Sequence, residues 1–455
     1  MKLGDKRVNN RLIDLADMLV ASEGDSWPNK FAQPADYHAF QDLVNRPEAT
    51  HESVRVPHTR QTRQRMAEAN QVVLIIHDTT ELDYSGRNTL HLGPIGNGGG
   101  RGWECHNSLA VDPNTRAVIG LANQILHRRV EKAVTEKETK AARRDRTSRE
   151  SRLWWQGITA CGVAPSGSVW IHVCDRGADC FELLQQLTDT KRSFVIRSKS
   201  NRALIVDDEK LQTEKKAKAK LHEVLRAMPA QVCWRGVART DKGKSRPVKL
   251  QACWAEFTLR PPHAKSGEYR KEGVRVGAIR VWEVDPPEGE KKGVEWILVT
   301  DQKITDALSV RQLVEYYERR PIIEEYHKAF KTGCGVEKLQ QRTGAALEAA
   351  IGITAILALG LLMLRDVARD ETRQSEPAAT LVGECSVCVL SVWRLGVAKV
   401  DWTVREFVKA LGRLGGHMNR PSDGIPGWQT LWRGLRKLRQ MIAYHQKAIA
   451  TYGSS

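Results

Sequence analysis

Short apolar runs rich in β-branched residues recur through the first two thirds of the chain. The run at residues 72–78 reads Val-Val-Leu-Ile-Ile-His-Asp and is bounded by polar residues, as is typical of a buried strand. A good turn sequence, Asp-Pro-Asn-Thr at residues 112–115, separates two of the later runs. This pattern predicts five strands, at residues 72–78, 105–111, 117–124, 168–175 and 193–198.

Helical patterns alternate with these runs. The segment up to about residue 70 has helical periodicity and many arginines, and it predicts a small basic helical domain. Residues 131–155 are charged, alanine-rich and free of proline, and predict a helix; a shorter helix is expected at residues 181–187. From about residue 304 onward the chain is predicted to be helical. The apolar stretch 349–364 is too short for a comfortable membrane span, so it is interpreted as a buried core helix.

The predicted order, β-β-β-α-β-α-β, indicates an α/β chain with a ribonuclease-H-like mixed sheet core, in which three meandering strands are extended by parallel ones. Residues 200–300 break this order with alternating apolar segments around a basic run, and predict a β-rich insertion. We therefore expect an N-terminal helical domain at residues 1–68, a core with its insertion at 69–350, and a C-terminal helical region at 351–455.

Several common functions are disfavoured. The glycine-rich residues 96–102 lack a terminal Gly-Lys-Ser/Thr and do not lead into a helix, so a flexible turn is expected instead of a phosphate loop. Nine cysteines, an odd number, with no signal-peptide pattern ahead of them, favour reduced thiols in a cytoplasm over a disulfide framework. The lone pair Cys385 and Cys388 is weak support for zinc, because no second pair stands at a suitable spacing.

Charge points to a polyanionic partner. The chain has 455 residues, and its apolar content of 41% and charged content of 27% are ordinary for globular protein. Its formal net charge of +17 is not ordinary. Because each neutralised phosphate releases counterions, such an excess favours nucleic acid, although a generally basic surface without a dedicated partner remains the alternative.

Three carboxylates carry the candidate chemistry. Asp78 and Asp175 each close a predicted strand, and Glu324 lies downstream in a predicted helix. Hard divalent cations prefer oxygen ligands, and two of them can hold the attacking and leaving oxygens of an in-line displacement at a phosphodiester. Either aspartate alone is equally consistent with a turn or cap residue. Together, in a basic chain, the three predict a two-metal site that cuts phosphodiesters.

Helical phasing adds basic residues to this set. At about 100° per residue, Glu324 and Lys331 lie on one face, because their separation of seven residues leaves a difference of about 20°. Tyr317 and Arg320 would fall near the same face if the helix were continuous. Pro321 lacks an N–H, so we expect the helix to kink or restart there. Arg320 and Lys331 would then hold backbone phosphates.

Aromatic and histidine residues near the acids leave alternatives open. Trp296 opens a predicted strand; an exposed indole there could stack on an unpaired base, but a core position is the more common role. His77 and His327 flank the acids, and their spacing fits no zinc pattern. Orientation of a neighbour or contact with a phosphate is the expected role of these two histidines.

These residues resemble a known family. The pattern Tyr317-x-x-Arg320-x-x-x-Glu324-x-x-x-x-x-x-Lys331 is similar to the tyrosine–arginine–glutamate–lysine signature of the insertion sequence four family of DDE transposases. Weaker matches occur in the right order along nearly the whole chain. They are Leu3-Gly-Asp5, His77-Asp-Thr-Thr80, Arg101-Gly-Trp103, Val173-Cys-Asp-Arg176, Val195-Ile-Arg-Ser-Lys199, Trp296 and Arg413-Leu-Gly-Gly416.

The resemblance implies cut-and-paste DNA transposition with two Mg²⁺ or Mn²⁺ ions per active site, through nicking, a DNA hairpin, hairpin opening and strand transfer. Asp78, Asp175 and Glu324 would bind the ions. Double-stranded DNA, as transposon ends and target, would be the partner of a homodimer that the C-terminal helices join, with the N-terminal domain reading the ends. The DNA-contacting residues would be Tyr317, Arg320, Lys331, Trp296, Arg197, Lys199, Lys6, Arg7 and Arg11. A bacterial, nucleoid-associated location is expected.

One departure from the family leads to the alternatives. Only Met1 and Lys2 precede Leu3-Gly-Asp5, whereas family members carry a further short segment that contributes to end binding. A shortened DNA-binding protein that dimerises with active transposase and inhibits it is therefore one alternative. A metal-dependent DNA nuclease without strand transfer is the other, since the same three acids would serve it.

Overall fold

The computed structural model describes most of the chain. Its described residues are 10–12, 15, 18–19, 27–31, 33–69, 72–87, 92–130, 151–205, 219–239, 245–262, 269–287, 293–420 and 423–452. The helix predicted at 131–155 therefore lies outside the described residues as far as residue 150. Its remainder belongs to α5 (Ser151–Ala160).

One mixed sheet of eleven strands forms the centre of the described chain. The strand order is β2-β3-β1-β5-β6-β11-β10-β9-β7, with β4 paired to β3 and β8 paired to β9. Strand β1 pairs antiparallel with β3 and parallel with β5, and β5 pairs parallel with β6. The strands are β1 (Val72–Asp83), β2 (Gly93–Ile95), β3 (Gly100–Val111), β4 (Val118–His127), β5 (Val169–Cys174), β6 (Ser193–Arg197), β7 (Leu204–Ile205), β8 (Val232–Arg239), β9 (Ser245–Leu259), β10 (Val274–Glu283) and β11 (Glu295–Thr300).

Strand β1 extends beyond the run that the apolar pattern marked. Asp78 was predicted to close this strand, and that prediction was wrong, because β1 continues to Asp83 by pairing with β3 alone. The glycine-rich turn was also predicted too long. Its last residues begin β3, where Gly102 faces Leu82 so closely that a Cβ would lie 1.8 Å from the Leu82 carbonyl oxygen. A second, polar half of β1 therefore extends past the acid.

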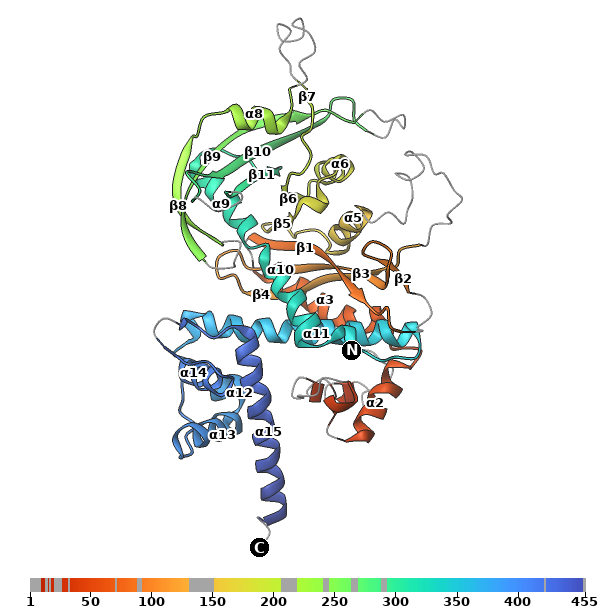
Figure 1. The fold of residues 1–455 in the computed structure, drawn as a ribbon, viewed down its shortest axis with the longest axis vertical. Coiled ribbons are helices and arrows are strands. Elements are labelled where there is room, and N and C mark those ends of the chain that lie inside the picture. Colours follow the sequence, from red (N-terminus) through yellow and green to blue (C-terminus); the bar gives the residue numbers. More distant parts are fainter. Residues whose placement is uncertain are drawn as a thin grey trace, which may run out of the picture.

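The β-rich region between residues 200 and 300 continues the central sheet. Strand β11 pairs antiparallel with β6, β10 pairs with β11, and β9 pairs with β10. These strands and the predicted core therefore form one continuous hydrogen-bonded sheet. In Figure 1 they form the curved wall beside α5, α6 (Phe181–Asp189) and α8 (Leu221–Ala227). This continuity places β11 directly beside the parallel strands of the core.

Helices follow the last strand of the sheet along the chain. Helix α9 (Ala307–Glu318) ends before Pro321, and α10 (Pro321–Lys328) restarts there with the proline at its first position, so the expected break at Pro321 is confirmed. Figure 1 shows α10 descending from the sheet toward α11 (Gly344–Arg369). Helix α11 is long and apolar enough to cross a membrane by length and composition, yet 67% of its apolar window is buried inside the protein. It packs against β4 and α3 (His51–Glu68), as a core helix does.

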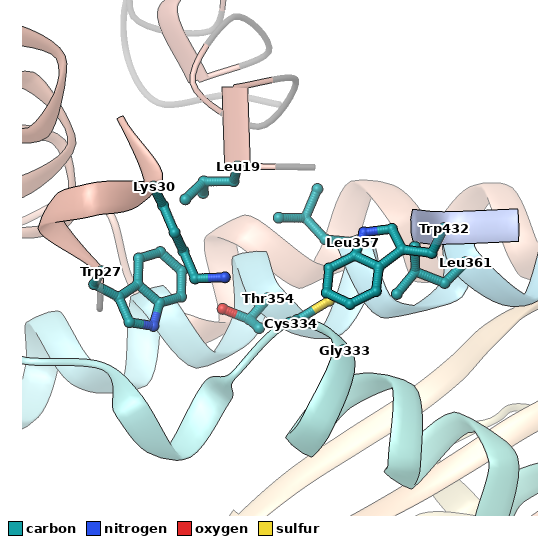
Figure 2. Close-up of a pocket in the computed structure, with 9 residues that line it drawn as sticks. All are labelled: Leu19, Trp27, Lys30, Gly333, Cys334, Thr354, Leu357, Leu361 and Trp432. Carbon is teal, nitrogen blue, oxygen red and sulfur yellow. The ribbon is translucent and has the colours of Figure 1, made fainter. Parts of the chain in front are cut away.

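The N-terminal and C-terminal helices meet below the sheet. The indole N–H of Trp27 donates to the Gly335 carbonyl at 3.1 Å, which fastens the segment before α2 (Pro34–Val44) to the chain after α10. Figure 2 shows Trp432 of the last helix approaching the same place across Cys334. These residues line a cavity of about 10 Å³, enough for no more than one water molecule. Three parts of the chain are thus packed closely at this point.

The C-terminal helices have a core of their own. Helices α12 (Ala379–Val382), α13 (Glu384–Leu395), α14 (Val404–Leu414) and α15 (Trp428–Tyr452) enclose a cluster that includes Leu390, Phe407, Leu411 and Leu431. In Figure 1, α15 extends away from the rest of the molecule. The crossing of α14 and α15 depends on glycine, because a Cβ on Gly434 would lie 2.1 Å from the Leu411 carbonyl oxygen.

The Gly434→Ala substitution should therefore push α15 away from α14. We expect the C-terminal helices to lose about 1–3 kcal/mol of stability, because overpacking at a backbone contact exceeds the helix-propensity gain of about 1 kcal/mol. Thermal unfolding followed by circular dichroism measures the change. Gly427→Ala is the matched control, since nothing lies within 4 Å of a Cβ there. Equal midpoints for the two variants would contradict the proposed close crossing.

Candidate functional site

The sheet places Asp78 and Asp175 side by side. The parallel pairing of β1 and β5 ends with His77 opposite Cys174, so each aspartate is the next residue on its strand. Asp175 caps a short 3-10 turn, where its Oδ1 accepts from the Gly177 N–H at 2.7 Å. Asp78 accepts from the Thr79 N–H through Oδ1 at 2.9 Å. Two carboxylates therefore emerge together at the carboxyl edge of adjacent parallel strands.

Glu324 reaches this edge from the first turn of α10. The chain offers two adjacent glutamates, and their surroundings differ. Glu325 forms an ion pair with Arg365 of α11, a guanidinium that is only 2% exposed and also donates to Asp366 at 2.7 Å. Glu324 is 54% exposed and pairs with Arg320. Glu325 thus anchors the helix, and Glu324 is the acid available to the site.

Arg320 lies between the acids. Its Nη1 is 3.4 Å from Asp78 Oδ2, and its Nη2 pairs with Glu324. The guanidinium is only 17% exposed, so water screens these contacts weakly. Arg320 stands at the break between α9 and α10, one residue before Pro321, which explains how a single arginine contacts both a strand and the next helix. The structure thus holds one cation within the acidic cluster.

Both other acids act on the pKa of Asp78. The pKa of Asp78 is raised to about 6, mainly because burial penalises its charged form, with further increases from Asp175 and Glu324. Arg320 opposes this rise. A cluster of this kind favours any cation that enters it, because each added positive charge relieves the repulsion between carboxylates.

The donor set suits hard divalent cations. All three side chains offer oxygen, which Mg²⁺ and Mn²⁺ prefer, and two of them come from rigid strand ends. Among the residues that the structure describes, no three acids, histidines or cysteines are close enough together to share one metal ion. The reason is local: Glu324 turns toward Arg320. Because Glu324 is more than half exposed, its side chain is free to rotate toward Asp78. The three acids are therefore chemically suited to bind divalent metal ions.

Aromatic residues border the acids. Trp296 on β11 and Tyr317 on α9 pack edge to face, with ring centroids 5.5 Å apart. Tyr317 is buried and Trp296 is half buried, so part of the Trp296 side chain reaches solvent. Burial is the main cause that raises the pKa of Tyr317, and Asp175 raises it further, whereas Arg197 lowers it. The structure therefore brings Tyr317, Trp296 and Arg197 to the same neighbourhood as the acids.

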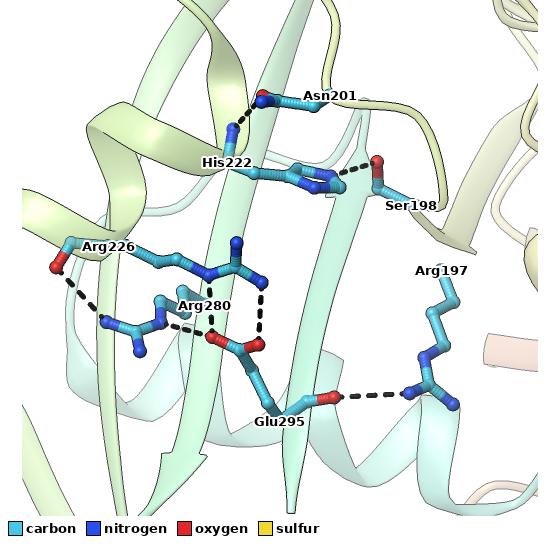
Figure 3. Close-up of polar contacts among 7 residues, drawn as sticks. All are labelled: Arg197, Ser198, Asn201, His222, Arg226, Arg280 and Glu295. Atoms are coloured by element: carbon cyan, nitrogen blue, oxygen red, sulfur yellow. Dashed lines mark hydrogen bonds and ion pairs between the residues drawn. The ribbon is translucent and has the colours of Figure 1, made fainter.

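Arg197 and Lys199 flank an organised loop after β6. Figure 3 shows the Arg197 guanidinium donating to the Glu295 carbonyl, at 3.1 Å. The buried carboxylate of Asp179 accepts from the N–H groups of Lys199 and Ser200 at 2.6 and 2.7 Å, and fixes the loop. The Lys199 side chain is exposed. Both basic residues predicted for DNA contact are thus held at the β6–β11 side of the site.

Lys331 is paired with an acid other than Glu324. The prediction that Glu324 and Lys331 share one face assumed a continuous α-helix, whereas residues Ala329–Gly333 form a wider π-helical turn. Lys331 Nζ instead pairs with Glu337 at 3.0 Å, and the same Glu337 oxygen accepts from the Asp83 N–H at 3.0 Å. The lysine is therefore held near the far end of β1.

The structure describes one of the three basic N-terminal residues predicted to contact DNA, which is Arg11. Arg11 forms an ion pair with Asp36 of α2 at 2.7 Å. Lys6 and Arg7 lie outside the described residues. Of the basic residues predicted to contact DNA, Arg320 contacts two of the acids, and Arg197 and Lys199 lie at and just after the end of β6.

Sequence reasoning missed a row of buried histidines behind the acids. His77 Nε2 is 2.9 Å from His172 Nδ1, and Ser108 Oγ is 3.0 Å from His77 Nδ1. His106 lies 2.8 Å from Thr79 Oγ1. Burial lowers the pKa of His106 and His172 to about 3, so these imidazoles are neutral. The available signal was weak: one histidine inside each of three apolar strands.

Comparison with known proteins gives two findings. Residues 171–359 match the family model described as the transposase DDE domain. This span runs from β5 into α11, so it includes Asp175 and Glu324 and begins after Asp78. Among solved structures, the chain is similar to piggyBac transposase in a cryo-EM synaptic complex with hairpin DNA, at 12% identity and a TM-score of 0.36. That likeness covers 98% of this chain and 73% of that chain, and a TM-score this low carries no argument.

The histidine row makes stability depend on pH. A buried histidine whose folded pKa is about 3 binds its proton more readily when the chain unfolds, where its pKa is near 6.5. Stability is therefore full above pH 6.5 and is lost progressively as pH falls toward 3, by up to about 1.4 kcal/mol per pH unit for each histidine. Urea unfolding at pH 7 and pH 5 should show this loss.

The His106→Gln variant should lose less stability than the parent protein between these pH values, because it removes one of the buried proton acceptors. His38→Gln, at an exposed histidine of α2, is the control. A pH dependence that is the same in all three proteins would exclude His106 as a contributor.

Proposed function

We propose that this chain, whose residues 171–359 match the transposase DDE domain, is a transposase that cuts and rejoins DNA by phosphoryl transfer at Asp78, Asp175 and Glu324. The observation that carries the proposal is that two aspartates follow the last paired residues of adjacent parallel strands, while Arg320 contacts both Asp78 of β1 and Glu324 of α10. Mg²⁺ or Mn²⁺, two ions per site, is the proposed cofactor.

The protein's part in the reaction is to hold charge and position. A pair of divalent ions bound by these acids would supply an activated attacking oxygen and stabilise the departing one. Asp78 and Asp175 hold their oxygens at fixed strand ends, so little reorganisation is required of them. Glu324 must turn away from Arg320 to join them, and its exposed side chain permits this rotation.

Basic and aromatic side chains would hold the DNA. Once released from Glu324, the Arg320 guanidinium can contact a phosphate through two parallel hydrogen bonds. Arg197 and Lys199 extend the positive surface along the β6–β11 side, and the net charge of +17 supports attraction of a polyanion. Trp296, which packs on Tyr317, is proposed to stack against a base displaced in a hairpin step of cut-and-paste transposition.

The remaining features of the proposal concern fold and assembly. The order β4-β3-β1-β5-β6, with β3 and β4 antiparallel and β5 and β6 parallel to β1, supports a ribonuclease-H-like core of the insertion sequence four type. Exposed apolar residues on and after α13, including Trp393 and Leu395, support a homodimer joined by the C-terminal helices. Lys6, Arg7 and Arg11 are proposed to read transposon ends, and Lys331 to contact their backbone.

Neutralising the acids tests the proposal. Asp78→Asn and Glu324→Gln should each lower metal-dependent cleavage by on the order of 10³-fold or more, because each removes a charged oxygen ligand. The substrate is duplex DNA that carries the native sequences flanking the coding region, assayed with Mg²⁺ or Mn²⁺. Glu325→Gln is the matched control: it neutralises the neighbouring acid and loosens Arg365, so it should lower thermal stability and reduce cleavage far less than Glu324→Gln does.

The products decide between the alternatives. Joined strands in a second, target duplex would support transposition, whereas cleavage without joining would favour a metal-dependent nuclease. An absence of cleavage by the parent protein, together with inhibition of an active relative, would favour the inhibitor. Unchanged cleavage by Glu324→Gln would rule out this assignment of the acids.

A further inference from the structure

A buried hydrogen bond joins the neighbours of two acids. Asn107 on β3 stands directly opposite Asp78 in the antiparallel register, so both side chains share one face of the sheet. His327 follows Glu324 by three residues on α10, and so lies on nearly the same helix face. The Asn107 Nδ2 donates to His327 Nε2 at 3.1 Å, and both side chains are buried.

This contact is the last in a chain of buried amides and imidazoles. Gln124 of β4 donates through Nε2 to Asn107 Oδ1 at 2.8 Å. Because that amide nitrogen faces Asn107, the Gln124 Oε1 faces the other way and accepts from His51 Nε2 of α3, at 3.0 Å. Every bond therefore donates in one direction, from α3 through β4 and β3 to α10. Reversing any member would place two donors or two acceptors against each other.

The surroundings make this chain rigid. Asn107 and Gln124 are at most 1% exposed, so an unmatched polar atom there would find no water to replace its partner. Burial lowers the pKa of His327 to about 3, which keeps its imidazole neutral and its Nε2 lone pair available to Asn107. On its other side α10 is held by Glu325, which pairs with Arg365 of α11. The helix is therefore fixed against the sheet and against α11.

We propose that His327 and Asn107 are positioning residues that set where Glu324 stands relative to Asp78, and that His51 and Gln124 extend this control to helix α3. The inference rests on the function proposed above, in which Glu324 and Asp78 act together. Glu324 is exposed and has no other contact in the described structure than Arg320, so the placement of its backbone decides which positions its carboxylate can reach.

His327→Leu tests the idea, because it removes the acceptor and keeps a side chain of similar bulk. We expect kcat for cleavage of the flanking-sequence duplex to fall roughly 10- to 100-fold, with the KM for DNA changed less than about threefold. Calorimetric binding of Mn²⁺ alone to the DNA-free, full-length protein should weaken roughly 10-fold. His327→Gln, whose amide oxygen can accept from Asn107, should restore both values.

His58→Leu is the matched structural control. His58 is a partly buried imidazole of α3 that accepts from the Leu121 N–H at 3.2 Å, but it is not part of the chain to α10. This variant should lose stability while keeping the parent's kcat and Mn²⁺ affinity. His51 lies at the first position of this series of hydrogen bonds. His51→Leu should therefore shift kcat and Mn²⁺ affinity in the same direction as His327→Leu does, and by less.

The outcomes separate the inference from the function. If Glu324→Gln abolishes cleavage while His327→Leu keeps the parent's kcat and Mn²⁺ affinity, positioning by His327 is refuted and the proposed function stands. If His327→Leu and His327→Gln are equally impaired, the Asn107 contact is not the cause, and the inference fails. Cleavage that survives Glu324→Gln would overturn the function itself.

Discussion

The site depends on one constraint, the parallel pairing of β1 and β5 up to the residues just before Asp78 and Asp175. Strand pairing fixes the backbone up to the residues just before both aspartates, so their side chains start from neighbouring positions. Burial sharpens the conflict, as the raised pKa of Asp78 shows. The fold must therefore supply positive charge at this point. In the structure that charge is Arg320, and its placement depends on the break in the helix before Pro321.

The helix carrying the third acid is held by contacts of two residues that follow Glu324 closely. Glu325 binds the buried Arg365, whereas His327 accepts from Asn107. Neither contact uses Glu324 itself, which leaves that side chain free to change partner. A rigid α10 that carries an exposed Glu324 suits a site that pairs with Arg320 when empty and would bind divalent ions when occupied.

The sequence predicted what is local. The apolar runs that precede Asp78 and Asp175 marked buried strands, and Pro321 marked the helix break. It failed where distant segments decide: β1 continues past Asp78 only because β3 offers hydrogen bonds to its polar half. The π-helical turn at Ala329–Gly333 leaves no trace in periodicity. Asn107 was missed for the same reason, since its importance lies in its cross-strand and helical partners.

Arg320 connects DNA binding with metal binding under the proposed function. Arg320 Nη1 faces Asp78 and Nη2 faces Glu324, so a phosphate that took two parallel hydrogen bonds from these two nitrogens would compete with both carboxylates. A phosphate that drew Arg320 away would leave the negative charge of Asp78 and Glu324 uncompensated. The acids would then hold divalent ions more tightly when DNA is present than when it is absent. By linkage the ions would strengthen DNA binding by the same factor. The three acids would therefore bind their metal ions fully only when DNA is bound.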